Sequence, residues 1–365
     1  MGHAPKHKAI RQLGGIAAAA MALCMAGPAQ ALVFNLTSTG NLSADAGFQR
    51  AANFWQGVFI DPITVNITAG FQALPANVLG SAGSNFQSST FSLMKAALAA
   101  DATSMDDATM VAGLPGGTSY SKLINGTTDA GGATHLQTGI TDLEMTRANA
   151  KAIGLAANNA AGEDARITFS SAFNFDFDPS DSIGAGLWDF VGIAIHELGH
   201  AMGFISGVDV LDYNSNGPGA GRYSDVQFSP FANPLDFTRC SQASQAAGAD
   251  MDWTIGNAAK DFAIDGNCSA LVSDAWSTGQ TFGDGRQASH WKDINPDGTG
   301  TGIGIMDPTA VWDGYMNMVT ARDVQALDVI GWTLRTNAVP EPASLLLVGT
   351  ALLGMGAMRR RAKAD

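Results

Sequence analysis

The sequence predicts an α+β fold that contains a buried helix. Apolar residues recur at helical spacing over residues 45–58, and residues 63–68 alternate in polarity as a half-buried strand does. Residues 187–195 are almost wholly apolar, so the helix that they begin belongs in a protein core. Helices and a strand of these types on one chain indicate an α+β protein.

The middle of the chain carries weaker signals. Helices are expected near residues 90–101 and 141–156, where the sequence is rich in Ala and other helix-forming residues. His135 stands among glycines with no partner at ligand spacing, which indicates a loop histidine. Regularly spaced Ile and Phe over residues 165–177 predict a further strand.

The most specific motif is His196-Glu197-Leu198-Gly199-His200, which follows the apolar run. On an α-helix, His196 and His200 lie one turn apart on one face, so their imidazoles can converge on one cation. Zinc lowers the pKa of a bound water toward ~7, and a nearby carboxylate can take that water's proton and deliver it to a leaving amine. The motif therefore predicts a catalytic zinc site with Glu197 as general base.

A catalytic zinc usually has three protein ligands, so one more must come from elsewhere in the chain. No other Glu occurs between Glu197 and Glu341, and His290 is the only histidine downstream of the motif. If His290 is instead a turn histidine, an aspartate such as Asp307 or Asp225 has to serve as the ligand.

Three later motifs follow the zinc motif in a fixed order: Ser289-His290-Trp291-Lys292, Gly304-Ile305-Met306-Asp307-Pro308 and residues 320–332. Over roughly residues 165–332, this order resembles the leishmanolysin-like metzincins, which are zinc peptidases with a subdomain inserted before the third histidine. The resemblance implies a mixed sheet, an active-site helix, His290 as third zinc ligand, Met306 in a turn beneath the metal and a closing helix over 320–330. It also implies that the strand at 165–177 is an edge strand that binds the backbone of a peptide substrate.

The chain departs from the compact form of that signature, because Ser206 stands where its third histidine would be. The resemblance therefore implies that the catalytic region, residues 32–338, has an upper lobe at about 32–203, an insertion at about 204–288 and a lower lobe at about 289–334.

Two cysteines remain outside the leader described below. Cys240 and Cys268 both lie in the expected insertion of an exported chain, where a disulfide is the expected state. This bond would cross-link the inserted segment that leads from His200 to His290.

Two segments match the opening of a calcium-binding loop, and calcium is therefore a second candidate cofactor. Neither segment has Glu at the twelfth position, and a hydrogen-bonded Asx turn is the alternative in both. The oxygen-bearing positions are Asp212, Asn214 and Asn216 in the first segment, and Asp293, Asn295 and Asp297 in the second.

Both ends of the chain carry export signals. Residues 1–31 combine early basic residues, an apolar run and Ala29-Gln30-Ala31, which is typical of a cleaved signal peptide. Residues 339–365 begin Val339-Pro340-Glu341-Pro342, continue with an apolar stretch and end in a basic cluster, and they resemble a PEP-CTERM sorting signal. The resemblance implies a Gram-negative source, an exosortase-type partner, transient inner-membrane contact, and a final place at the cell surface or extracellular matrix. A simple tail anchor is the alternative.

The charge of the remaining chain excludes some partners. The leader takes three basic residues with it, and the tail takes four basic and two acidic ones, which leaves 13 basic against 31 acidic residues, a net charge of −18. Nucleic acid and anionic membrane are therefore poor partners, and membrane contact is expected only through the sorting tail.

Two functions remain open. The leading hypothesis is an exported zinc endopeptidase that acts on peptide or protein substrates. The alternative is a non-catalytic cell-surface or matrix protein on a metallopeptidase scaffold, which the sorting tail would equally suit. Glu197 favours the enzyme, because a structural zinc site needs no general base.

Overall fold

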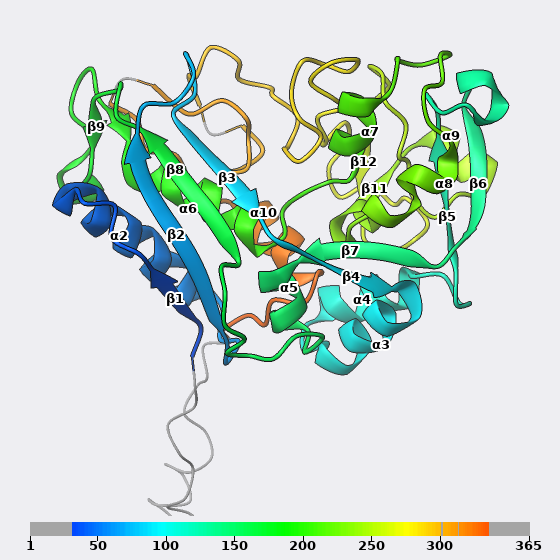
Figure 1. Ribbon diagram of the computed structural model, residues 1–365, viewed down its shortest axis with the longest axis horizontal. Coiled ribbons are helices and arrows are strands. Elements are labelled where there is room, and N and C mark those ends of the chain that lie inside the picture. The colour runs from blue at the N-terminus through cyan, green and yellow to red at the C-terminus, as the bar shows by residue number, and fades with distance from the viewer. Residues whose placement is uncertain (1–30, 301, 313, 336–365) are drawn as a thin grey trace, which may run out of the picture.

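The computed structural model describes residues 31–300, 302–312 and 314–335 (Figure 1). The predicted leader up to residue 30 and the predicted sorting tail lie outside the described residues. No helix within the described ranges is long and apolar enough to cross a membrane. The structure mixes helices and strands, so the predicted α+β class is confirmed.

A four-stranded sheet forms the left half of the molecule in Figure 1. Its order is β1 (Val33–Leu36), β2 (Thr64–Gln72), β8 (Ala165–Ser170) and β3 (Gly80–Ser84). The first three strands are parallel, and β3 runs antiparallel to β8. The sheet is therefore mixed, and β2 confirms the strand expected at 63–68.

Two helices pack against each other and against this sheet. They are α2 (Leu42–Val58), which confirms the helix expected at 45–58, and α6 (Phe190–Met202) (Figure 1). The Asn41 side chain caps α2 by accepting from two backbone amides of its first turn. The buried indole of Trp55 donates to the carbonyl of Ile195 at 3.0 Å, so α2 holds α6 in place.

The predicted edge strand at 165–177 is wrong. β8 ends at Ser170 and lies inside the sheet, between β2 and β3. The two edge strands are β1 and β3, and β3, with the sequence Gly-Ser-Ala-Gly-Ser, is the edge that contacts α6. β8 is interior because its apolar side chains, such as Ile167 and Phe169, are fully buried, whereas the small residues of β3 can lie at an open cleft.

The helix expected at 141–156 is also partly wrong. Residues Asp142–Thr146 form β7, which pairs antiparallel with β4 (Phe86–Thr90), and only Arg147–Ala152 form a helix, α5. Pairing with β4 makes residues 142–146 a strand instead of the first part of a helix. The helix expected near 90–101 is confirmed as α3 (Phe91–Asp101).

The rest of the described chain forms shorter elements and loops. The segment between α6 and His290 contains short helices, short strands and long loops, which occupy the right half of Figure 1. The helix expected at 320–330 is present as α10 (Ala321–Asp328). The other α-helices and strands are α4 (Met105–Gly113), β5 (Tyr120–Ile124), β6 (His135–Ile140), β9 (Phe175–Asp176), β10 (Trp188–Asp189), α7 (Val208–Asn214), α8 (Asp225–Phe228), β11 (Arg239–Cys240), α9 (Gln242–Ala247) and β12 (Asp261–Phe262).

Candidate metal centre

Helix α6 presents the first two histidines. Its N-terminus is capped by Asp189, whose carboxylate accepts from the amide of Gly192 at 2.8 Å. It ends at Gly203, whose φ of 118° is a left-handed conformation that favours glycine. The chain reverses there and brings the carbonyl of Phe204 within 2.7 Å of His200 Nδ1.

The structure brings His196, His200 and His290 together, although His290 lies 90 residues beyond His200. The Nε2 atom of His200 lies 3.0 Å from that of His196 and 3.2 Å from that of His290. Two nitrogens on one tetrahedral zinc, each at 2.0–2.1 Å from it, are separated by ~3.3 Å. The three side chains therefore have the spacing of a zinc-binding triad.

Backbone carbonyls fix the protonation of all three rings. A carbonyl can only accept, so each Nδ1 carries the hydrogen and each Nε2 keeps a lone pair that faces the centre. Such lone pairs repel one another unless a cation lies between them. The Nδ1–carbonyl pairs are His196 with Ile305 at 2.6 Å, His200 with Phe204 at 2.7 Å, and His290 with Gln287 at 3.2 Å.

Burial keeps these imidazoles neutral. It lowers the pKa of His196 to about 4 and that of His200 to about 3, and it lowers the pKa of His290 well below its ordinary value. For His200 and His290, the neighbouring histidines lower the pKa further. All three rings are thus in the form that binds a metal at neutral pH.

Glu197 is buried beside the triad and lies against strand β3. Burial raises its pKa to about 8, and a hydrogen bond with the backbone of Ala82 opposes that rise. A Cβ on Gly80 would lie 3.0 Å from Glu197 Oε1, so this glycine lets β3 approach the carboxyl group closely. A cation held by the histidines would lower the Glu197 pKa again and leave a carboxylate that can accept a proton.

Met306 lies directly under the zinc motif and is fully buried. A Cβ on Gly199 would lie only 2.6 Å from the Met306 sulfur, so glycine is needed between the two helical histidines. The amide of Trp291 donates to the carbonyl of Met306 at 3.0 Å, which joins the methionine turn to the segment that carries His290.

Asp323 of α10 was not singled out from the sequence, yet it connects α10 to the segments that carry His290 and Met306. Its buried carboxylate accepts from the Trp291 indole at 2.8 Å and from the amides of Ile305 and Met306 at 2.9 and 3.1 Å. It also completes the capping box of α10 with Thr320. The Thr320-x-x-Asp323 pattern was the available signal, but it predicts only a helix start.

The triad opens into a cleft of about 410 Å³. Strand β3 and the loop before it form one wall, and residues around Arg286 and Asp307 form another. Asp307, which was an alternative ligand, thus lines the cleft, but it is not part of the histidine cluster.

The other alternative ligand, Asp225, instead pairs with His135 at 2.8 Å. His135 is the first residue of β6, so the expectation that it lies in a loop is wrong.

The first calcium motif lies in a helix and beyond its end. Asp212 belongs to α7, and its carboxylate accepts from the amides of Thr281 and Phe282 at 2.6 and 2.9 Å. Asn214 bonds within its own helix, and Asn216 is exposed. The Asp212 carboxylate is therefore used to hold the loop at 281–282.

The three oxygen-bearing residues of the second calcium motif each contact a different partner. Asp293 pairs with Arg286 at 2.8 Å, and Asn295 lies against Gly300. Asp297 forms an Asx turn with Thr299. Among the described residues, the histidine triad is the one group of three or more His, Cys, Asp or Glu side chains whose ligand atoms lie within 4.8 Å of one another.

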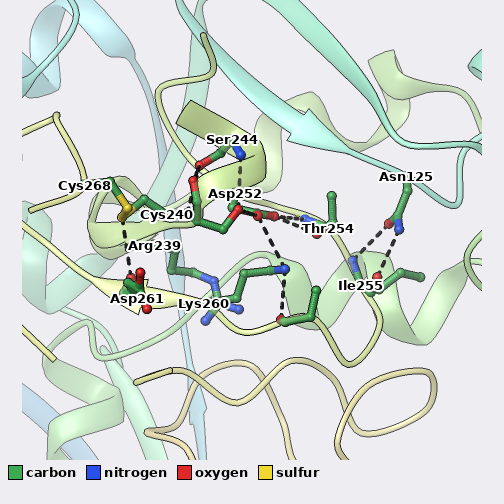
Figure 2. A network of polar contacts seen from close by, with 12 residues as sticks. Asn125, Arg239, Cys240, Ser244, Asp252, Thr254, Ile255, Lys260, Asp261 and Cys268 are labelled. Atoms are coloured by element: carbon green, nitrogen blue, oxygen red, sulfur yellow. Dashed lines mark hydrogen bonds and ion pairs between the residues drawn. A yellow bond between two sulfur atoms is a disulfide. The ribbon is translucent and has the colours of Figure 1, made fainter. Parts of the chain in front are cut away.

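Cys240 and Cys268 form the predicted disulfide, with Cα atoms 5.7 Å apart (Figure 2). Beside it lies a buried polar network in which Asp252 accepts from Thr254 at 2.6 Å and lies 3.4 Å from the Lys260 ammonium group. The disulfide and this network stabilise the segment between His200 and His290.

Comparison with known proteins identifies one family model. Residues 338–361 match the PEP-CTERM protein-sorting motif. This motif implies recognition by exosortase sorting machinery, and it points to an exported protein of Gram-negative bacteria with a C-terminal membrane anchor before processing. No curated protein and no solved structure matches the chain.

Proposed function

We propose that this protein is an exported zinc-dependent endopeptidase of metzincin-like architecture. The observation that carries the proposal is the convergence of three neutral imidazole Nε2 atoms beside a buried glutamate, at the floor of a cleft bounded by an edge strand. Three imidazoles with a fourth position left open are one of the ligand sets found at catalytic zinc sites. Met306 beneath the triad and α10 behind it agree with the metzincin resemblance.

The residues have distinct roles in this proposal. His196, His200 and His290 would hold zinc, and when bound the metal would lower the pKa of water and polarise the carbonyl of the scissile bond. Glu197 would take a proton from the attacking water and give it to the nitrogen of the leaving amine, as the water oxygen bonds to the carbonyl carbon and the C–N bond breaks. The site is buried at its base, which strengthens each of these electrostatic interactions.

Strand β3 supplies the substrate-binding surface in this proposal. It is the sheet edge next to Glu197, and its residues 80–82 line the cleft. An extended peptide can add to such an edge through backbone hydrogen bonds, which selects for main chain more than for side chains. Small residues in β3 leave the edge open for this pairing.

Proteolysis of an unfolded protein such as casein tests the proposal. The wild type should cleave, lose activity with a zinc chelator and regain it with added zinc, whereas Glu197→Gln should bind zinc and be inactive. Removing a general base typically costs about 10²–10⁴-fold in rate. Glu163→Gln is the matched control, because Glu163 pairs with Arg166 at the surface and should be dispensable.

The scaffold alternative makes the opposite prediction. The sorting motif favours it as much as it favours an enzyme, since the motif concerns delivery alone. Zinc binding by the wild type without any chelator-sensitive cleavage would reject the peptidase and leave a surface protein with a structural metal.

A further inference from the structure

His290 lies on a segment that has no helix or strand to hold it. Residues 288–290 are turns and bends, in a segment between two isolated bridges at Arg286 and Trp291. The two other histidines of the triad are fixed by α6, so the position of the third depends on side chains that hold this segment.

One of these side chains is Asp209, on α7 in the segment that follows the zinc motif. Its carboxylate accepts from the amide of Ala288 at 2.6 Å, from the amide of Ser289 at 3.1 Å and from the Ser289 hydroxyl. The Ser289 hydroxyl oxygen in turn accepts from the amide of Ser206 at 2.9 Å. The residue immediately before His290 is thus held through both its backbone and its side chain.

The second is Arg239, which is fully buried in β11 next to Cys240 (Figure 2). Its guanidinium donates to the carbonyl of Ala288 at 3.1 Å and to that of Ser277 at 3.0 Å. The amide of Ser277 donates to the carbonyl of His290 at 3.1 Å. Arg239 therefore fixes Ala288 directly and supports the residue that bonds His290.

These contacts surround one peptide segment with opposite charges. Asp209 accepts from the N–H groups of Ala288 and Ser289, and Arg239 donates to the C=O group of Ala288. The positive charge of Arg239 also stabilises the negative charge of Asp209. Only a carboxylate can accept all three donors, because an amide would offer one oxygen and turn its NH₂ group toward an N–H.

We propose that Asp209 and Arg239 are positioning residues that set His290 at metal-binding distance from His196 and His200. This inference rests on the proposed role of His290 as a metal ligand, and it gives the inserted segment a purpose, which is to hold the third histidine. Partners that orient metal ligands in this way typically contribute about 10–100-fold in metal affinity.

Metal affinity of the full chain tests the inference without any activity assay. Zinc would be titrated against a competing chelator, and the visible spectrum of the cobalt-substituted protein would report the ligand geometry. Asp209→Asn should weaken zinc binding by about 10–100-fold and shift the cobalt bands. Asp250→Asn is the matched control, since Asp250 accepts from the amide and hydroxyl of Ser121 at 2.7 Å each and contacts none of the histidines.

A second pair of variants covers the case in which Asp209→Asn fails to fold. Ser289→Ala removes the hydroxyl bond and should weaken zinc binding, whereas Ser289→Thr keeps a hydroxyl and should restore it. Wild-type affinity and spectra in both Asp209→Asn and Ser289→Ala would overturn the inference. Tight zinc binding that depends on Asp209, without proteolysis, would refute the peptidase and support the positioning role.

Discussion

Because Gly199 lies against Met306, Gly199→Ala should destabilise the protein, although the same substitution normally stabilises a helix. Alanine in place of glycine inside a helix normally stabilises a protein by about 0.5–1 kcal/mol. Here the new Cβ would lie 2.6 Å from the Met306 sulfur and 3.2 Å from its methyl carbon, and overpacking of this kind typically costs about 1–3 kcal/mol. Gly199→Ala should therefore lower the free energy of unfolding by about 1–2 kcal/mol.

Removing the methionine side chain should reverse that effect. All the Met306 atoms that the new Cβ would meet lie beyond the Met306 Cβ, so Met306→Ala removes the clash. Met306→Ala alone should cost about 2–5 kcal/mol through the cavity that it leaves. In that background, Gly199→Ala should stabilise the protein by about 0.5–1 kcal/mol, and the coupling energy between the two sites should be about 1.5–3 kcal/mol.

Urea unfolding of the metal-free protein measures this cycle, because zinc binding would otherwise add its own contribution to stability. The four proteins are the wild type, the two single variants and the double variant, all with the disulfide intact. Additive effects, within about 0.5 kcal/mol, would refute the close packing of the methionine turn under the zinc motif.

Three further predictions concern stability. Loss of the Cys240–Cys268 bond, which closes a loop with a sequence separation of 28, should lower the free energy of unfolding by about 3.5 kcal/mol, and chemical denaturation of the double alanine variant checks this. Burial raises the pKa of Asp328 from 3.8 to about 7. The contribution of this carboxyl group to the free energy of unfolding is therefore most favourable below pH 3.8 and is lost as the pH rises through 7. Asp328→Asn should therefore exceed the wild type in stability at pH 8, on the order of 2 kcal/mol, and lose that advantage toward pH 4, which melting curves across pH would show. Trp55→Phe removes the bond to the Ile195 carbonyl and should cost about 1–3 kcal/mol, which urea unfolding measures; no loss would show that this bond does not anchor α6.

Residues that share one helix were the most predictable part of the site. His196 and His200 are four apart, and helical geometry alone places them together. The pairing of the two cysteines needed only their number and the export signals. These predictions depend on local spacing or on counting, so no knowledge of the tertiary structure was required.

Long-range contacts were less predictable. Strand β3 has the sequence of a flexible loop, and it becomes a strand because β8 pairs with it and because small residues fit beside Glu197. The segment 142–146 has helix-forming neighbours, yet pairing with β4 makes it a strand. Asp209 bonds backbone groups 79 and 80 residues away, and nothing in its sequence neighbourhood marks those partners.

The X-ray absorption spectrum of the zinc-loaded protein tests the central claim most directly. We expect a single zinc per chain with a first shell of nitrogen and oxygen at ~2.0–2.1 Å and outer-shell scattering from three imidazoles. That signal should fall to two imidazoles in His290→Ala. A wild-type spectrum with only two imidazoles, or with an oxygen-rich shell at longer distance, would contradict the assignment of His196, His200 and His290 as the metal ligands.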